Sequence, residues 1–179
     1  TLFPYTTLFR SELPPNDWQS VFGGPAWTRV TEPDGSPGQW YLHVFTPWQP
    51  DWNWENDEVQ QHFDEVLRFW FDRGVDGFRI DALNFAMHDP LLRDNPPAAP
   101  DGRPRTRPFD FQQQLFNQSH ADIPRFIERI RALTDSYDGI FTVAEVGGKD
   151  AERYMLYDRA SHSLALMASA KPHKPGTKY

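Results

Sequence analysis

The chain has 179 residues, with 25 Asp and Glu against 18 Lys and Arg, so its formal net charge is −7. This acidic balance argues against nucleic acid as a partner, because phosphate binding needs a basic face. Cysteine is absent, which excludes disulfides, thiolate metal sites and a cysteine nucleophile, and no apolar run is long enough to span a membrane. We expect a cytoplasmic protein without a membrane partner.

The two ends of the chain differ in character from its centre. Residues 1–11, TLFPYTTLFRS, resemble a translated sequencing adaptor, so we expect them to stand outside the natural fold. A genuine β-rich start is the alternative. Residues 160–179 form an uncertain tail that ends in a polar, Pro-containing stretch without periodicity, as a frameshift or a frayed terminus would produce.

Residues 12–56 are rich in Pro, Gly, Asn and Trp. Turn-forming clusters occupy residues 22–27 and 33–38, and a short strand is predicted over residues 39–45. We therefore interpret this stretch as an irregular subdomain or a long insertion.

A helix is predicted to begin at Asp57, with Asn56 as its cap, and to end at Gly74. Its apolar residues recur at helical spacing and predict one buried face. These residues are Val59, Phe63, Val66, Leu67 and Trp70.

A strand follows over residues 75–83, in which Arg79 and Asp81 share one face because residues two apart point the same way. After a Pro-rich loop, a second helix is predicted over residues 122–136 and a second strand over residues 139–148, with Glu145 near its end. The apolar stripe of this helix consists of Ile123, Phe126, Ile127, Ile130 and Leu133.

The order strand, helix, strand is that of a βαβ unit, which predicts an α/β fold with parallel strands. In a (β/α)8 barrel the carboxyl ends of the strands form the active-site face, and a full barrel takes ~250 residues, so this chain can hold only a part of one.

Asp81 and Glu145 lie late in strands that are expected to be buried, where a carboxylate is costly unless it is paired or used. Two carboxylates across a sugar are what glycosidic cleavage needs: one attacks the anomeric carbon or activates water, and the other protonates the leaving oxygen. Arg79 could keep Asp81 ionised. A structural Arg–Asp ion pair with one capping Glu is the alternative.

Four segments resemble the alpha-amylase family of glycoside hydrolases. Residues 77–85, GFRIDALNF, resemble the strand-four signature G-F-R-x-D, and residues 142–148, TVAEVGG, resemble the strand-five segment. Residues 49–53, QPDWN, are similar to Q-P-D-L-N of the oligo-1,6-glucosidase and alpha-glucosidase branch, with Trp in place of Leu. Residues 16–27 resemble the domain-B segment inserted in that branch.

The resemblance implies a partial (β/α)8 TIM barrel over residues 57–159, preceded over residues 12–56 by the end of domain B. It implies that Asp81 is the nucleophile, Glu145 the general acid/base and Arg79 the positioning residue. Phe22 would be an aromatic wall of the sugar pocket, with domain-B packing as the alternative, and Ala82 resembles enzymes that prefer α-1,4 links.

The family's D-x-x-x-N-H segment and its later N-H-D segment with a third catalytic Asp do not occur in this sequence. We therefore expect an internal fragment of a retaining alpha-glucosidase, which would be inactive by itself. A transglycosylase or a sucrose- or trehalulose-handling isomerase is the enzymatic alternative, and a non-catalytic binding subunit is the alternative from another class. The expected partner is an α-glucoside.

No cofactor is expected, because the sequence holds no nucleotide-binding glycine motif. The spacing of His88, Asp89 and Asp94 fits no strong metal-ligand pattern, so we expect no metal.

Overall fold

The computed structural model describes residues 5–102 and 104–146, and the backbone of residues 165–168. The tail expected over residues 160–179 therefore lies almost entirely outside the described residues. The chain divides into two compact units, which are described one at a time. The first holds residues 1–63 and 85–121, and the second holds residues 64–84 and 122–179. Residues 85–121, which were expected to belong to the barrel segment, thus group with the insertion.

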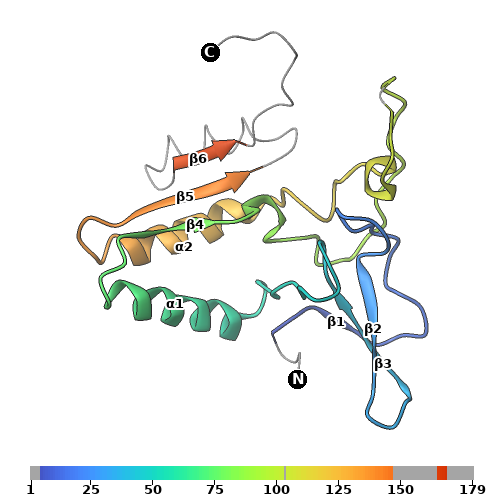
Figure 1. The fold of residues 1–179 in the computed structure, drawn as a ribbon, viewed down its shortest axis with the longest axis horizontal. Helices are drawn as coiled ribbons and strands as arrows, with labels where there is room; N and C mark the ends of the chain where they lie inside the picture. Colours follow the sequence, from blue (N-terminus) through green and yellow to red (C-terminus); the bar gives the residue numbers. More distant parts are fainter. Residues whose placement is uncertain (1–4, 103, 147–164, 169–179) are drawn as a thin grey trace. The chain divides into compact units, whose positions relative to one another are not determined.

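The first unit contains an antiparallel sheet in the order β1-β3-β2, formed by β1 (Leu8–Phe9), β2 (Trp27–Thr31) and β3 (Pro37–Leu42) (Figure 1). Strand β2 was not predicted, and β3 begins two residues before the predicted strand. The turn between them explains the hairpin. The Asp34 carboxylate accepts a hydrogen bond from the Ser36 backbone N–H at 2.9 Å, and Gly35 adopts a φ of 83° that suits glycine.

Leu8 and Phe9 take part in this sheet, although residues 1–11 were expected to stand outside the fold. Leu8 pairs with Tyr41 and Phe9 with Trp40, and Thr6 is buried and bridges to Trp52.

The core of the first unit gathers around two tryptophans whose indole N–H groups are both satisfied. The Trp18 Nε1 donates to the Arg93 carbonyl at 2.8 Å, and the Trp27 Nε1 donates to Asn16 Oδ1 at the same distance. Burial of such large rings stabilises the unit because their single polar atom has a partner. The buried apolar residues of this core are Trp18, Ala26, Trp27, Leu42 and Val44.

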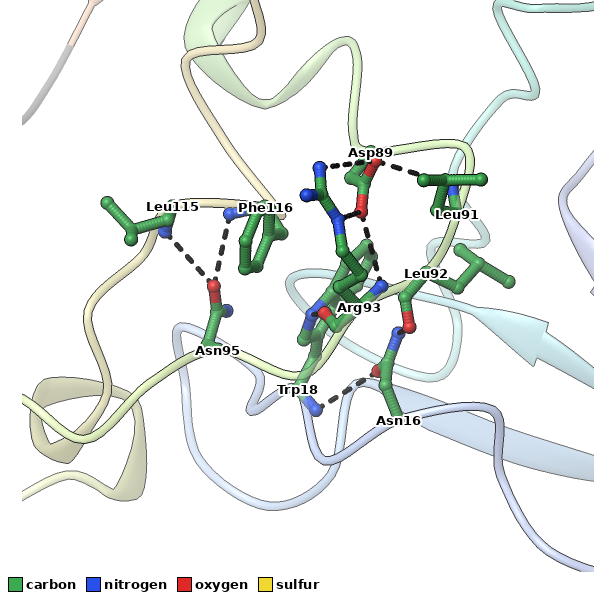
Figure 2. A network of polar contacts seen from close by, with 9 residues as sticks. All are labelled: Asn16, Trp18, Asp89, Leu91, Leu92, Arg93, Asn95, Leu115 and Phe116. Carbon is green, nitrogen blue, oxygen red and sulfur yellow. Dashed lines mark hydrogen bonds and ion pairs between the residues drawn. The ribbon is translucent and has the colours of Figure 1, made fainter.

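The loop predicted after residue 83 is ordered by side chains that bond to backbone groups (Figure 2). It contains the short 3-10 helices η1 (Leu83–Phe85) and η2 (Pro108–Phe111). Asp89 Oδ2 accepts from the Arg93 backbone N–H at 3.2 Å, and Asn95 Oδ1 accepts from the backbone N–H groups of Leu115 and Phe116. These bonds satisfy backbone groups that a loop without regular structure would otherwise leave unpaired.

Helix α1 (Asp57–Phe71) begins where it was predicted, and the Asn56 Oδ1 accepts a hydrogen bond from the Glu58 backbone N–H at 2.9 Å, as a helix cap does. The predicted end is also confirmed: Gly74 has a φ of 85°, and its N–H donates to the Phe71 carbonyl at 2.9 Å.

The buried face of α1 differs from the predicted one. Val59 and Leu67 are buried as expected, but Val66 and Trp70 are exposed, and Phe71 is buried instead. Val59, Leu67 and Phe71 are separated by multiples of four residues. Because 3.6 residues make one turn, each step of four moves the buried position around the helix by about 40°. The buried row therefore runs on to Phe71, whose ring lies 5.2 Å from that of Phe78 and 5.0 Å from that of Tyr137.

The second unit contains the predicted parallel sheet. Strands β4 (Gly77–Ile80), β5 (Phe141–Val146) and β6 (Ala165–Ala168) lie in the order β4-β5-β6, with both neighbouring pairs parallel (Figure 1). Helix α2 (Ile123–Thr134) connects β4 to β5 in the chain and lies along the sheet. All five residues of its predicted stripe are buried, so this prediction is confirmed.

The sheet is buried on one face only, whereas parallel strands are normally apolar and covered on both faces. On β5, Thr142, Ala144 and Val146 are buried, while Phe141 on the alternate face is 62% exposed. The described strands form two open three-stranded sheets and no closed barrel. None of the helices in the described ranges has the length and apolar character needed to cross a bilayer.

Candidate active site

The register of the two central strands brings Asp81 level with Glu145. Ile80 pairs with Ala144, and each of these residues is followed directly by a carboxylate. Because the strands are parallel, both carboxylates leave the sheet at the same edge. This edge is the carboxyl end of the strands, where α/β proteins bind their ligands.

A single guanidinium nitrogen connects the two carboxylates. The Arg79 Nη2 lies 3.0 Å from the Asp81 Oδ1 and donates a hydrogen bond to the Glu145 Oε2. Arg79 therefore contacts both groups, although it was expected to support Asp81 alone. Two carboxylates that share one nitrogen are close enough for one small ligand to contact both.

Arg79 and Asp81 are exposed and Glu145 is half-buried, contrary to the expectation that they lie in buried strands. The exposed fractions are 51% for Arg79, 75% for Asp81 and 36% for Glu145. The physical reason is the uncovered face of the sheet, since Glu145 alternates with the buried residues of β5. Ion pairs at this exposure stabilise a fold by only ~0–1 kcal/mol, so fold stability does not explain the arrangement.

The chain turns sharply immediately after Asp81. Ala82 has a φ of 45°, in the left-handed region, and it leads into η1, where Leu83 and Asn84 are each 1% exposed. Asp81 thus occupies the first position after a strand and precedes a buried turn. Ala82 was predicted as a site residue from the sequence, which does not indicate its backbone conformation.

Phe22 belongs to the first unit. Its side chain is 69% exposed and follows Val21 into a turn with glycines at two positive-φ positions, Gly23 and Gly24. The ring lies 5.6 Å from that of Phe45. The structure brings together Arg79, Asp81, Ala82 and Glu145 in one unit, whereas Phe22 belongs to the other.

Asp51, in the QPDWN segment, was not predicted as a residue of interest. The residue is half-buried, but burial of its carboxyl raises the pKa to about 7, although the Val44 backbone N–H donates to Oδ2 at 2.9 Å and opposes the shift. The Asp51 N–H donates to the Leu42 carbonyl at 3.0 Å. The position of this Asp directly after a Pro-containing turn was the signal in the sequence that could have identified it. That position points to a structural role for Asp51.

The His88, Asp89 and Asp94 cluster also has structural partners. Burial, with His120 nearby, lowers the His88 pKa to about 4, and its ring packs edge-on against Trp18 at 5.6 Å. Asp89 Oδ2 forms an ion pair with the Arg93 Nε at 2.7 Å, and Asp94 Oδ1 accepts a hydrogen bond from the Asp17 backbone N–H at 2.9 Å. In the part of the chain that the structure describes, no group of three or more metal-ligating side chains comes together.

The second unit thus presents two carboxylates and an arginine at the carboxyl ends of parallel strands, which is where (β/α)8 enzymes place their active sites. The sequence profile of the alpha amylase catalytic domain matches residues 4–169. The chain therefore belongs to the alpha-amylase family of glycoside hydrolases.

Similar proteins carry names from the alpha-glucosidase branch. The "Probable alpha-glucosidase" of Rhizobium meliloti is 42% identical over 145 residues, which cover 78% of this chain and 25% of that protein. The oligo-1,6-glucosidase of Parageobacillus thermoglucosidasius is 37% identical over 171 residues, which cover 92% of this chain and 28% of that protein. The crystal structure of an alpha-glucosyl transfer enzyme matches with a TM-score of 0.79 at 40% identity, over 89% of this chain and 31% of that one.

The chain thus spans about a quarter to a third of the length of these relatives. The sequence resemblance to the family is confirmed, together with the α/β class and the parallel strand pair.

Proposed function

We propose that this chain is part of a longer retaining alpha-glucosidase, which hydrolyses α-glucosidic bonds, with α-1,4 bonds preferred, in disaccharides or short oligosaccharides. The observation that carries the proposal is the contact of one Arg79 nitrogen with both Asp81 and Glu145 at adjacent strand ends. In the proposed fold, the second unit is the part of a (β/α)8 barrel that holds strands four and five. Most of the first unit is the end of an inserted domain.

In the proposed mechanism Asp81 is the nucleophile. Its carboxylate forms a bond to the anomeric carbon while the bond to the leaving oxygen breaks, and Glu145 gives that oxygen its proton. Glu145 then removes a proton from water, which attacks the anomeric carbon and releases Asp81. Arg79 holds both carboxylates in position before the sugar binds. Ala82, beside the nucleophile, and Phe22, as an aromatic wall, would contact the substrate.

The experiment compares Asp81→Asn and Glu145→Gln in the longer protein that contains this chain. Both variants should lose about 100-fold or more of their activity on maltose, because each lacks a group that acts in the transition state. Glu145→Gln should keep more activity on p-nitrophenyl α-glucoside, whose leaving group needs little protonation, whereas Asp81→Asn should be slow on both substrates. Asp138→Asn, an exposed carboxylate of the same unit, is the matched control and should be unaffected.

Near-parental rates on maltose for either variant would contradict the assigned roles. The anomer released first is read by NMR, and an inverted product would contradict retention. If the unmodified longer protein is inactive although all its motifs are intact, this would instead favour the alternative that it is a non-catalytic binding subunit. Such a subunit has no need of the two carboxylates.

Transfer of the glucosyl group is the second candidate. It is favoured by the similarity to the alpha-glucosyl transfer enzyme and to the isomaltulose synthase of Klebsiella sp. LX3, which matches with a TM-score of 0.71 at 30% identity. Both reactions share the glucosyl-enzyme and differ in the acceptor. Product analysis with maltose and with sucrose separates them: glucose should dominate for a hydrolase, and longer or isomeric sugars for a transferase.

A further inference from the structure

We infer that Ser20 is a positioning residue, which holds the exposed ring of Phe22 in place for a sugar to pack against it. This inference rests on the proposed function, in which Phe22 is an aromatic wall of the sugar pocket, and it names the residue that fixes this wall. The observation that suggests it is a buried hydroxyl, on a residue that is 1% exposed, which bonds to the backbone of both Phe22 and Phe45.

Packing holds the Phe22 ring only in part. The side chain is 69% exposed, and its ring meets that of Phe45 at a centroid distance of 5.6 Å and an angle of 58° between the ring planes. A ring with so much free surface takes its direction from the backbone that carries it. The position of the wall therefore depends on the turn formed by residues 20–24.

This turn is permissive at its tip. Gly23 and Gly24 have φ angles of 109° and 82°, which glycine adopts at no steric cost. Among the described residues, no atom outside the adjoining chain lies within 4 Å of the point that a Cβ would take at either glycine. Contacts at the tip therefore do not select its conformation, and that selection is left to hydrogen bonds.

Ser20 bonds to the turn through its backbone and through its side chain. Its N–H donates to the Gly24 carbonyl at 2.8 Å, and its carbonyl accepts from the Gly23 N–H at 3.1 Å. Its Oγ accepts from the Phe22 N–H at 3.2 Å and donates to the Phe45 carbonyl. A hydroxyl can donate and accept at once, so its two bonds coexist and tie the backbone of Phe22 to a second segment of the chain.

Loss of the hydroxyl should free Phe22 while the base of the turn stays in place. Ser20→Ala leaves the Phe22 N–H and the Phe45 carbonyl without this partner, and the N–H gains by turning toward water. The glycines at the tip permit that movement. The base is held independently, because the Val21 N–H donates to the Val44 carbonyl at 2.8 Å.

The experiment uses the longer protein that contains this chain. It measures kcat and KM on maltose, and the Kd of the glucose-like inhibitor 1-deoxynojirimycin by calorimetry. The variants are Ser20→Ala, Phe22→Ala and the double variant, and the thermal midpoint of each is recorded. Ser36→Ala is the matched control, because Ser36 is a turn serine of the same unit and follows Gly35, which has a φ of 83°.

We expect Ser20→Ala to raise KM and Kd by about three- to tenfold with kcat within about twofold of the parent, because a wall that binds ground state and transition state alike affects KM alone. The double variant should bind no more weakly than Phe22→Ala, since two residues that act through one contact do not have additive effects. Ser36→Ala should keep the parental kcat, KM and Kd.

Parental KM and Kd for Ser20→Ala, with Phe22→Ala impaired, would overturn the inference and leave the proposed function intact. Additive losses in the double variant, or an equal loss in Ser36→Ala, would overturn it as well. If Ser20→Ala does not fold, Ser20→Cys makes the same comparison, because a thiol bonds more weakly than a hydroxyl.

The proposed function fails in distinguishable ways. A parental Kd for Phe22→Ala would remove the aromatic wall from the proposed function and overturn the inference with it. A longer protein that binds the inhibitor but hydrolyses no maltose would contradict the proposed hydrolysis, and the Kd values of Ser20→Ala and the double variant would still decide whether Ser20 acts through Phe22.

Discussion

At the scale of single residues, Gly77 shows why the G-F-R-x-D pattern begins with glycine. Gly77 pairs with Phe141, and a Cβ placed on it would overlap the Phe141 carbonyl oxygen. Any other residue would push β4 and β5 apart at their first pair. It would thereby disturb the register that brings Asp81 level with Glu145. The glycine thus acts on the site through the spacing of two backbones.

Asp51 leads to a prediction about pH. Its pKa is raised by burial from the model-peptide value of 3.8 to about 7, so the folded protein binds this proton more tightly than the unfolded chain. The contribution of Asp51 to stability is therefore greatest below pH 3.8 and is lost as pH rises toward about 7.

Asp51→Asn should abolish the loss of stability at high pH, because the amide keeps an oxygen that accepts from the Val44 N–H and carries no charge. We expect the variant to be more stable than the parent at pH 8, on the order of 1–3 kcal/mol, with little difference at the lowest pH at which both fold. Urea unfolding at several pH values checks this, with the exposed Asp138→Asn as control. A stability gain that is the same at every pH would show that the Asp51 charge is not responsible.

At the scale of elements, the two helices differ in how fully their apolar residues are covered. Every residue of the α2 stripe is buried, whereas Val66, Phe69 and Trp70 of α1 are between 38% and 47% exposed. Helix α1 is held by its Asn56 cap and by Phe71, which packs on Phe78 and Tyr137. The stability of the second unit therefore depends more on α2.

Ile127 provides the test, since it lies in the middle of the α2 stripe and is 2% exposed. Ile127→Ala should destabilise the protein by ~2–5 kcal/mol, through lost apolar burial and the cavity that remains. Denaturant unfolding measures the loss. Arg125→Ala, whose parent side chain is 83% exposed on the same helix, should cost less than about 0.5 kcal/mol. Similar losses for both variants would show that α2 does not pack as described.

At the scale of the whole molecule, the open parallel sheet decides how the 179-residue polypeptide should behave alone. Phe141 is 62% exposed on the uncovered face of β5, and β4 pairs only with β5 among the described strands. Exposed strand edges and apolar faces favour association with other chains.

We therefore expect residues 1–179 expressed alone to bind a hydrophobic dye such as ANS, to self-associate in size-exclusion chromatography with light scattering, and to hydrolyse no p-nitrophenyl α-glucoside. The longer protein in the same buffer is the control and should remain dispersed. A monomeric 179-residue polypeptide with a sharp cooperative melt and no dye binding would contradict this expectation.

The sequence by itself determined the local elements and proposed the residues of the site. The start and end of α1, the stripe of α2 and the parallel pair of strands follow from caps, spacing and the order of elements, which are local signals. Arg79, Asp81 and Glu145 were proposed as site residues from charges late in apolar strands and from the resemblance to a family motif.

Only the tertiary structure decided features that depend on residues far apart in the chain. These are the joint contact of Arg79 with both carboxylates, the pairing of β1 with β3, the replacement of Trp70 by Phe71 in the buried row, and the grouping of residues 85–121 with the insertion. Each depends on which surface is available for packing or pairing, and a one-dimensional pattern does not contain that information. The positive φ of Ala82 belongs with them, because the fixed strand before it and the buried turn after it impose a conformation that alanine alone would not choose.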